Sequence, residues 1–104
     1  MNGDIEKLVK ECRLEEAVEM LGALIEEMKR SGGSASDQQR KELDKELAGL
    51  YFSRGKLYWR LSRRGEAQSD YARAVALDPQ SPASIALGQA REVEDFFNPD
   101  LYNP

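Results

Sequence analysis

The residues that could do chemistry in this chain of 104 residues are few. Ser53 and Lys56 fit the S-x-x-K spacing in which a lysine stands next to a serine nucleophile, but the companion motifs of those enzymes are absent. Glu15 and Glu19 are one helical turn apart, on a flank where acids usually face solvent. We therefore expect a protein that is not an enzyme.

The histidine and cysteine counts remove several other kinds of site. The chain has no His and a single Cys, so it can build no internal disulfide, no imidazole-dependent triad and no zinc site from Cys and His. We predict no metal and no cofactor. Cys12 is interpreted as a small residue at a helix end, and a reactive thiol near Lys10 and Arg13 is the alternative.

The residues best suited to binding combine positive charge with aromatic rings. The net charge is −4, yet residues 51–64 hold five bases and no acid. Lys45, Lys56, Arg60 and Arg63 fall together on one polar arc of a helix, with Phe52 and Trp59 at its edge. Cationic heads beside aromatic anchors suit an acidic or amphipathic peptide. The candidate peptide-binding residues are Phe52, Lys56, Trp59, Arg60 and Arg63.

Other interpretations of these bases stay open. They can simply solvate an exposed helix face while Trp59 packs in the core. Nucleic-acid binding is a further alternative, but a sequence pI near 4.9 and the lack of a recognised motif lead us to expect no nucleic-acid partner. Because no apolar run nears membrane-spanning length and the first residues alternate charge, we expect a cytoplasmic protein without a membrane partner.

The elements that must position these residues are helical. Apolar residues recur at helical spacing over 4–30, with a break near Cys12–Leu14, and again over 37–62, 66–77 and 82–96. The segment 31–37 indicates a linker, and Ser36 with Gln39 fits a capping box that opens the central helix. Apolar side chains surround much of this central helix, so it must be covered on more than one side.

Residues 48–81 follow a pattern of helix, turn and helix over 34 residues. The pattern is W-x2-L-G-x2-Y, then A-x3-F, then a closing Pro, and the chain resembles the tetratricopeptide-repeat family at these positions. Arg54 departs from it, because it occupies the Leu position; we expect its side chain to reach solvent or to pair with a neighbouring acid such as Glu16 or Glu19. The matching residues are Tyr51, Gly55, Tyr58, Ala67, Tyr71, Ala74 and Pro79.

The spacing also has a direct physical reading. A mid-helix glycine costs roughly 1 kcal/mol relative to alanine, so Gly55 needs a reason, and the close approach of a neighbouring helix supplies one. Ala67 and Ala74 are small for the same purpose, and Tyr58 and Tyr71 can fill the flanks of the contact.

The resemblance implies an all-α fold, a tetratricopeptide-like helix-turn-helix repeat stack of about five helices with a C-terminal capping helix. The single domain, 1–104, divides into a degenerate helix pair at 4–30, the linker, a full repeat at 38–81, the capping helix at 82–97 and a tail at 98–104. Ala17 and Leu21 suit the A-x3-F pair of the degenerate repeat.

The family is one of binding scaffolds, so the resemblance implies a non-catalytic protein–protein interaction module with a protein or peptide partner. Its clamp for C-terminal carboxylates is not carried over, because Phe52 and Lys56 stand where that clamp needs Lys and Asn.

Self-association is the alternative function. A free C-terminal tail would expose Phe96, Phe97, Leu101 and Tyr102. Either the tail packs back on the helices, or the capping helix and tail dock on a second copy to form a homodimer. We expect a monomer or a weak homodimer.

Overall fold

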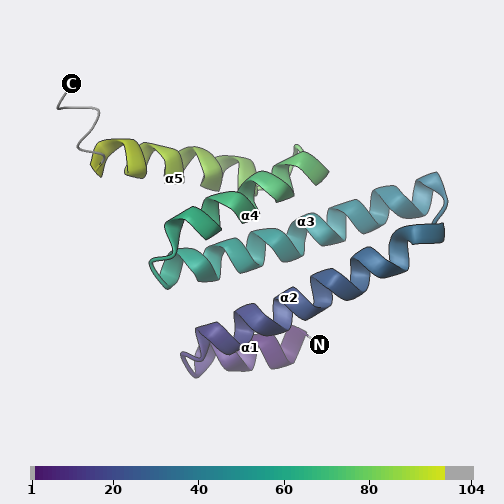
Figure 1. Ribbon diagram of the computed structural model, residues 1–104, viewed down its shortest axis with the longest axis horizontal. Helices are drawn as coiled ribbons and strands as arrows, with labels where there is room; N and C mark the ends of the chain where they lie inside the picture. Colours follow the sequence, from purple (N-terminus) through teal and green to yellow (C-terminus); the bar gives the residue numbers. More distant parts are fainter. Residues whose placement is uncertain (1, 98–104) are drawn as a thin grey trace.

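The computed structural model describes residues 2–97, and the regular elements of this part of the chain are all helices, as predicted (Figure 1). Its α-helices are α1 (Asn2–Lys10), α2 (Leu14–Ser31), α3 (Asp37–Arg60), α4 (Arg64–Leu77) and α5 (Ala83–Phe97). A short 3₁₀ turn, η1 (Gly32–Ser34), follows α2. The predicted tail at 98–104 lies outside the described residues, as do the side chains of Phe96 and Phe97.

The helix ends agree with the local signals in the sequence. The Ser36 side chain accepts a hydrogen bond from the Gln39 backbone N–H, and the Gln39 side chain accepts one from the Ser36 backbone N–H, so the predicted capping box is confirmed. Helix α4 ends at Leu77, and extended Asp78 follows, as expected for a residue before Pro79. Helix α3 ends at Arg60 rather than near 62, and η1 lies within the predicted linker, 31–37.

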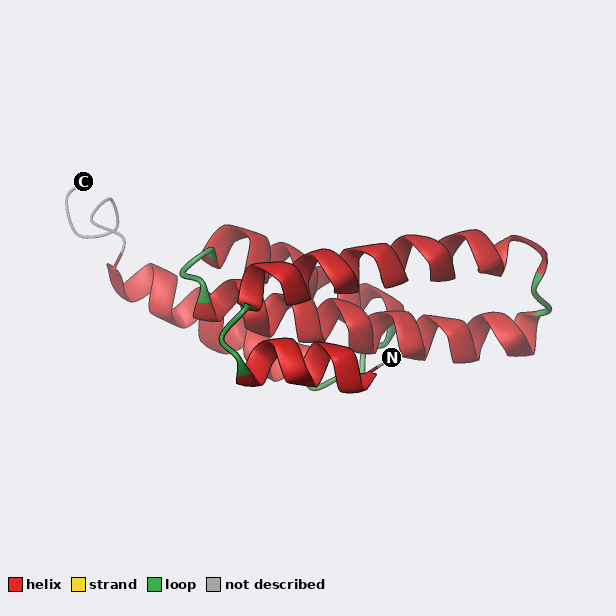
Figure 2. Cartoon of the chain, turned by 90° about the horizontal axis from the view of Figure 1, so that it is seen from below, coloured by secondary structure: helices red, strands yellow, loops and turns green. Residues whose placement is uncertain are grey.

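Helix α3 is the middle element of the molecule. The helices pack chiefly in chain order, with α3 between α2 and α4, and α5 on α4 (Figures 1 and 2). One buried cluster includes Ile25 of α2, Tyr51 of α3, Tyr71 of α4 and Leu87 of α5. A second cluster joins Leu57 of α3 to α1 and α2. The prediction that the central helix is covered on more than one side is therefore confirmed.

Gly55 marks the closest approach of α3 and α4. A Cβ atom added at Gly55 would lie 2.7 Å from Cε1 and 2.8 Å from Cδ1 of Tyr71, and 3.3 Å from the Ala67 carbonyl oxygen. Tyr71 is only 4 % exposed and Ala67 is fully buried. The glycine thus gives the Tyr71 ring its place against α3, as the spacing indicates.

The turns α1–α2 and α3–α4 share one backbone design. Cys12 and Ser62 have left-handed φ values of 60° and 62°. Each turn is closed by the same kind of hydrogen bond: the Arg13 N–H donates to the Leu8 carbonyl and the Arg63 N–H to the Tyr58 carbonyl, both at 2.8 Å. In both hairpins the arginine before the second helix pairs with the glutamate three residues on, Arg13 with Glu16 and Arg63 with Glu66.

Candidate peptide-binding surfaces

Two of the predicted binding residues form a cation–aromatic pair on α3. The Lys56 Nζ lies 4.7 Å from the ring centroid of Phe52. The Phe52 ring is half-buried and its centroid is 5.9 Å from that of Tyr71, so it is fixed by packing against α4. Lys56 is exposed. The pair therefore presents a positive charge on an anchored ring.

Trp59 and Arg60 extend this surface toward the end of α3. Trp59 is half-buried, and the guanidinium carbon of Arg64, the first residue of α4, lies 5.2 Å from its ring centroid. Arg60 is exposed, and neither Arg60 nor Lys56 has an ion pair among the side chains that the structure describes. Phe52, Lys56, Trp59, Arg60 and Arg64 together are called the basic surface below.

Arg63 lies apart from this surface. Its Nε donates to Glu66 Oε1 at 2.7 Å, and its guanidinium carbon is 4.8 Å from the ring centroid of Tyr58. The hydrogen bonds from Arg63 to Glu66 are the largest cause of its raised pKa. Tyr58 follows Phe52 by six residues, so the two side chains point roughly 120° apart around α3. Arg63 thus contributes to a different face of the hairpin than the sequence pattern indicates.

Arg54 is held by a carboxylate that the sequence analysis missed. Its Nε donates to Asp70 Oδ2 at 2.7 Å and its Nη2 to Asp70 Oδ1 at 2.8 Å. Arg73 Nη1 donates to the same Oδ1 at 2.9 Å. The expectation that Arg54 pairs with an acid of a neighbouring helix is confirmed, but the acid is Asp70 of α4 rather than Glu16 or Glu19, because Asp70 comes into reach across the turn.

The groups around Arg54 have a structural role, because they join α3 to α4. Asp70 is fully buried and its oxygens accept three hydrogen bonds from two guanidinium groups. The hydrogen bonds with Asp70 raise the pKa of Arg54, which keeps it charged. Its guanidinium carbon also lies 5.5 Å from the Tyr51 ring centroid and 5.8 Å from that of Tyr58. All these groups satisfy one another, so the cluster holds α3 to α4.

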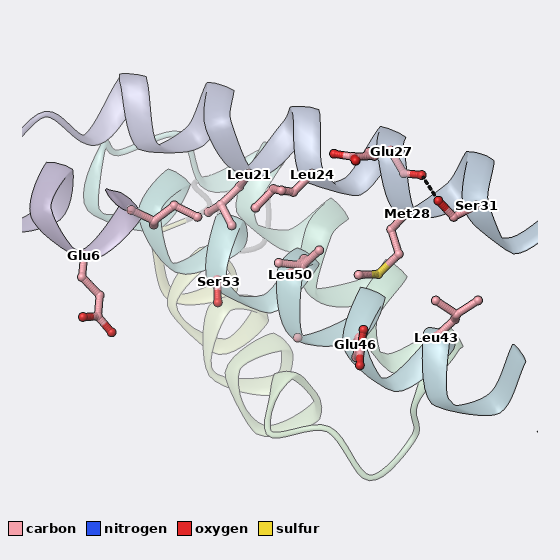
Figure 3. A pocket seen from close by; sticks show the side chains of 12 residues that line it. Glu6, Leu21, Leu24, Glu27, Met28, Ser31, Leu43, Glu46, Leu50 and Ser53 are labelled. Carbon is pink, nitrogen blue, oxygen red and sulfur yellow. Dashed lines mark hydrogen bonds between the residues drawn. The ribbon is translucent and has the colours of Figure 1, made fainter. Parts of the chain in front are cut away.

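A groove lies between α2 and α3, near the beginning of α1 (Figure 3). It has a volume of about 750 Å³ and a largely apolar lining. Its floor includes Leu24 and Met28 of α2 and Leu43 and Leu50 of α3. The sequence analysis expected the central helix to be covered on more than one side but did not predict that the side with Leu43 and Leu50 is left partly open.

The described part of the chain offers no sign of a metal centre or a membrane span. Among these residues there is no group of three or more Cys, Asp or Glu side chains placed to hold a metal ion. None of the described helices is both long enough and apolar enough to cross a bilayer. Cys12 is an exposed, free thiol in the α1–α2 turn.

No protein-family model, no curated protein and no solved structure matches this chain.

Proposed function

We propose that this protein is a non-catalytic interaction module that binds an acidic or amphipathic peptide on the basic surface of α3. The observation that carries the proposal is the state of Lys56 and Arg60. Both are exposed and lack a carboxylate partner among the described residues; the half-buried Phe52 ring lies beside Lys56, and Arg60 follows the half-buried Trp59 in the sequence. Free cations next to fixed rings are the combination that favours an acidic segment with apolar side chains.

The position of Arg64 supports the same proposal. Its guanidinium lies over Trp59, whereas Arg63 is engaged by Glu66 and Tyr58. The proposed binding surface therefore includes Arg64 in place of Arg63. Each cation of this surface then lies beside an aromatic ring or next to an aromatic residue in the sequence. A short surface of this kind is expected to bind with a dissociation constant on the order of micromolar.

We further propose that the helices form a tetratricopeptide-like repeat stack. Two features support it: the close approach at Gly55 and the common backbone design of the α1–α2 and α3–α4 turns. When the two turns are aligned, Ala17 corresponds to Ala67 and Leu21 to Tyr71, as a degenerate first repeat requires. These four residues are all buried. Helix α5 would then be the capping helix.

The test uses the only Trp of the chain as its reporter. We expect a peptide of alternating Glu and Leu or Phe residues to change the fluorescence of Trp59. The variant Lys56→Glu/Arg60→Glu/Arg64→Glu should weaken this binding roughly tenfold or more, because it reverses three contacts of modest individual strength.

The matched control reverses three bases elsewhere. Arg40, Lys41 and Arg91 are exposed and lie outside the basic surface, so Arg40→Glu/Lys41→Glu/Arg91→Glu gives the same net charge. If both triple variants weaken binding equally, general charge attraction explains it and the proposed site is wrong. If the first triple variant captures a protein partner as well as the unmodified protein does, this result would also contradict the proposal.

Self-association through α5 is the second candidate. Ile85 of α5 is 66 % exposed and is the single exposed large hydrophobic residue among the described side chains. We expect a dimer of this kind to dissociate in Ile85→Lys and on removal of 96–104, as measured by sedimentation at micromolar concentration. A strict monomer in the unmodified protein would remove this candidate.

A further inference from the structure

The groove between α2 and α3 lies beyond the part of this hairpin that α1 covers. Helix α1 begins part-way along the α2–α3 hairpin and runs toward the α1–α2 turn, and the hairpin continues past the beginning of α1 (Figure 2). Past that point α2 and α3 face no further helix of the described chain on this side. Apolar side chains that a longer first helix would bury are left in an open groove; they include Leu24, Met28, Leu43 and Leu50.

The floor of the groove is apolar and continuous with the core. Leu21 is 2 % exposed, whereas Leu24, Met28, Leu43 and Leu50 are each half-buried. Leu24 and Met28 extend from α2 toward Leu43 and Leu50 on α3 (Figure 3). At Gly49 an added Cβ would meet nothing within 4 Å, so the backbone of α3 itself forms part of the floor.

The rim of the groove is acidic. Glu6 of α1, Glu27 of α2 and Glu46 of α3 line it, and all three are exposed. No Lys or Arg is among the lining residues. None of the three carboxylates forms an ion pair within the described part of the chain. A charged rim of one sign around an apolar floor selects a ligand with the opposite charge.

We infer that this groove binds an amphipathic helix of a partner protein whose polar face is rich in Lys and Arg. The inference goes beyond the proposed function, because it concerns another surface and a ligand of the opposite charge. The partner helix would occupy the space that continues α1, with Leu-type residues at i, i+3, i+4 and i+7 on the floor. Its basic residues would lie beside Glu6, Glu27 and Glu46.

A helix fits this space better than an extended segment. The lining runs along α2 from Leu21 to Ser31, which is roughly 15 Å or about three helical turns. Its two walls are helices, which present grooves that accept the side-chain ridges of a third helix. An extended strand would leave backbone hydrogen-bonding groups unpaired against these apolar walls.

A second copy of this chain is a poorer occupant. Two grooves placed face to face would bring the carboxylates of Glu6, Glu27 and Glu46 together, and like charges in contact oppose association. Apart from Ile85, the described side chains include no exposed large hydrophobic residue. The described helices therefore offer no apolar stripe that could fill the groove of another copy.

The test uses a defined probe. A labelled peptide of about fourteen Leu and Lys residues in an amphipathic helical pattern is titrated with the full chain, and binding is followed by fluorescence anisotropy. The same peptide with Glu in place of Lys is the reference. We expect the Lys peptide to bind with a dissociation constant on the order of micromolar. In the variant Lys56→Ala/Arg60→Ala/Arg64→Ala, which removes the basic surface as a second site for acidic peptides, the Glu peptide should bind at least tenfold more weakly than the Lys peptide.

Gly49 allows the groove to be blocked without a change of charge. We expect Gly49→Phe to weaken binding of the Lys peptide roughly tenfold or more, because the ring would occupy the floor. Gly88→Phe is the matched control, since Gly88 is also an exposed helical glycine with nothing within 4 Å of an added Cβ. Circular dichroism establishes that both variants keep their helices. Equal binding to the two variants would overturn the inference.

Charge reversal on the rim provides a second, independent variant. Glu27→Lys/Glu46→Lys should reduce the affinity for the Lys peptide several-fold and raise that for the Glu peptide, whereas Glu19→Lys/Glu92→Lys should affect both far less. Equal effects would show general attraction to an acidic protein and contradict a specific groove. If the protein alone forms a dimer that Gly49→Phe dissociates, the groove is a contact between copies and the assignment to a partner helix is wrong.

Discussion

Asp70 is the residue on which the join between α3 and α4 depends most strongly. It is a fully buried carboxylate, yet each of its oxygens accepts a hydrogen bond from Arg54. A buried pair of this kind adds little net stability compared with apolar residues of similar size, but breaking it leaves a charge without a partner. The pair therefore matters more for the relative placement of the two helices than for total stability.

We expect Asp70→Ala to destabilise the protein by about 3 kcal/mol, because Arg54 would keep its charge at a half-buried position. Arg54→Leu, which places the residue type of the repeat pattern at this position, leaves Asp70 with Arg73 alone and should also destabilise. The double variant Arg54→Leu/Asp70→Ala should recover part of the loss, with a coupling free energy of about 1–3 kcal/mol. Urea unfolding measures all three.

Glu66 provides the control for this cycle. Its pair with Arg63 is also bidentate, with Nε–Oε1 and Nη2–Oε2 distances of 2.7 Å, but both side chains are about half exposed. Glu66→Ala should therefore change stability far less than Asp70→Ala. Equal effects of the two substitutions would mean that burial does not govern the strength of these pairs.

The partner of Arg54 could not be read from the sequence. The sequence shows that a guanidinium at an apolar position needs an acid, and this requirement is met. Which acid meets it depends on the register between α3 and α4, which the left-handed turn at Ser62 sets. Asp70 falls beside Arg54 only after that turn is formed.

At the scale of the element, α3 contains two glycines with opposite surroundings. Gly55 lies against Tyr71, whereas Gly49 faces the open groove. Replacing Gly55 by Ala should destabilise the protein by about 1–3 kcal/mol, because the clash with a buried ring exceeds the gain in helix propensity. Gly49→Ala should stabilise it by roughly 0.5–1 kcal/mol. Thermal unfolding measures whether each variant is more or less stable than the unmodified protein. Higher stability in both variants would contradict the close contact at Gly55.

The ends of the helices were predictable from local chemistry, but the groove was not. Ser36 with Gln39 and Asp78 with Pro79 carry the signals for a helix start and a helix stop in neighbouring residues. The groove is formed by side chains of three helices, with Glu6 on α1, Glu27 on α2 and Glu46 on α3. Their proximity depends on how these helices pack, which no short stretch of sequence encodes, so the acidic rim could not be recognised as one surface.

At the scale of the molecule, the helices form a row in which α1 packs mainly on α2 and α5 mainly on α4. An end helix such as α1 can unfold while the contacts among the other helices remain. Unfolding of α3 would break its contacts with both α2 and α4. We expect backbone amides of α1 to exchange with solvent at least about a hundredfold faster than those of α3 around Gly55. Hydrogen exchange followed by mass spectrometry measures this, and uniform protection would show a single cooperative unit instead.

The row of helices also has a consequence for how quickly the fold forms. Each helix packs mainly against the helix before or after it in the chain, so the pairing of neighbours needs no long loop to close. Helical topologies of this kind fold in about microseconds to milliseconds, and the hairpin of α1 and α2 can assemble on the ribosome while later residues are still being synthesised.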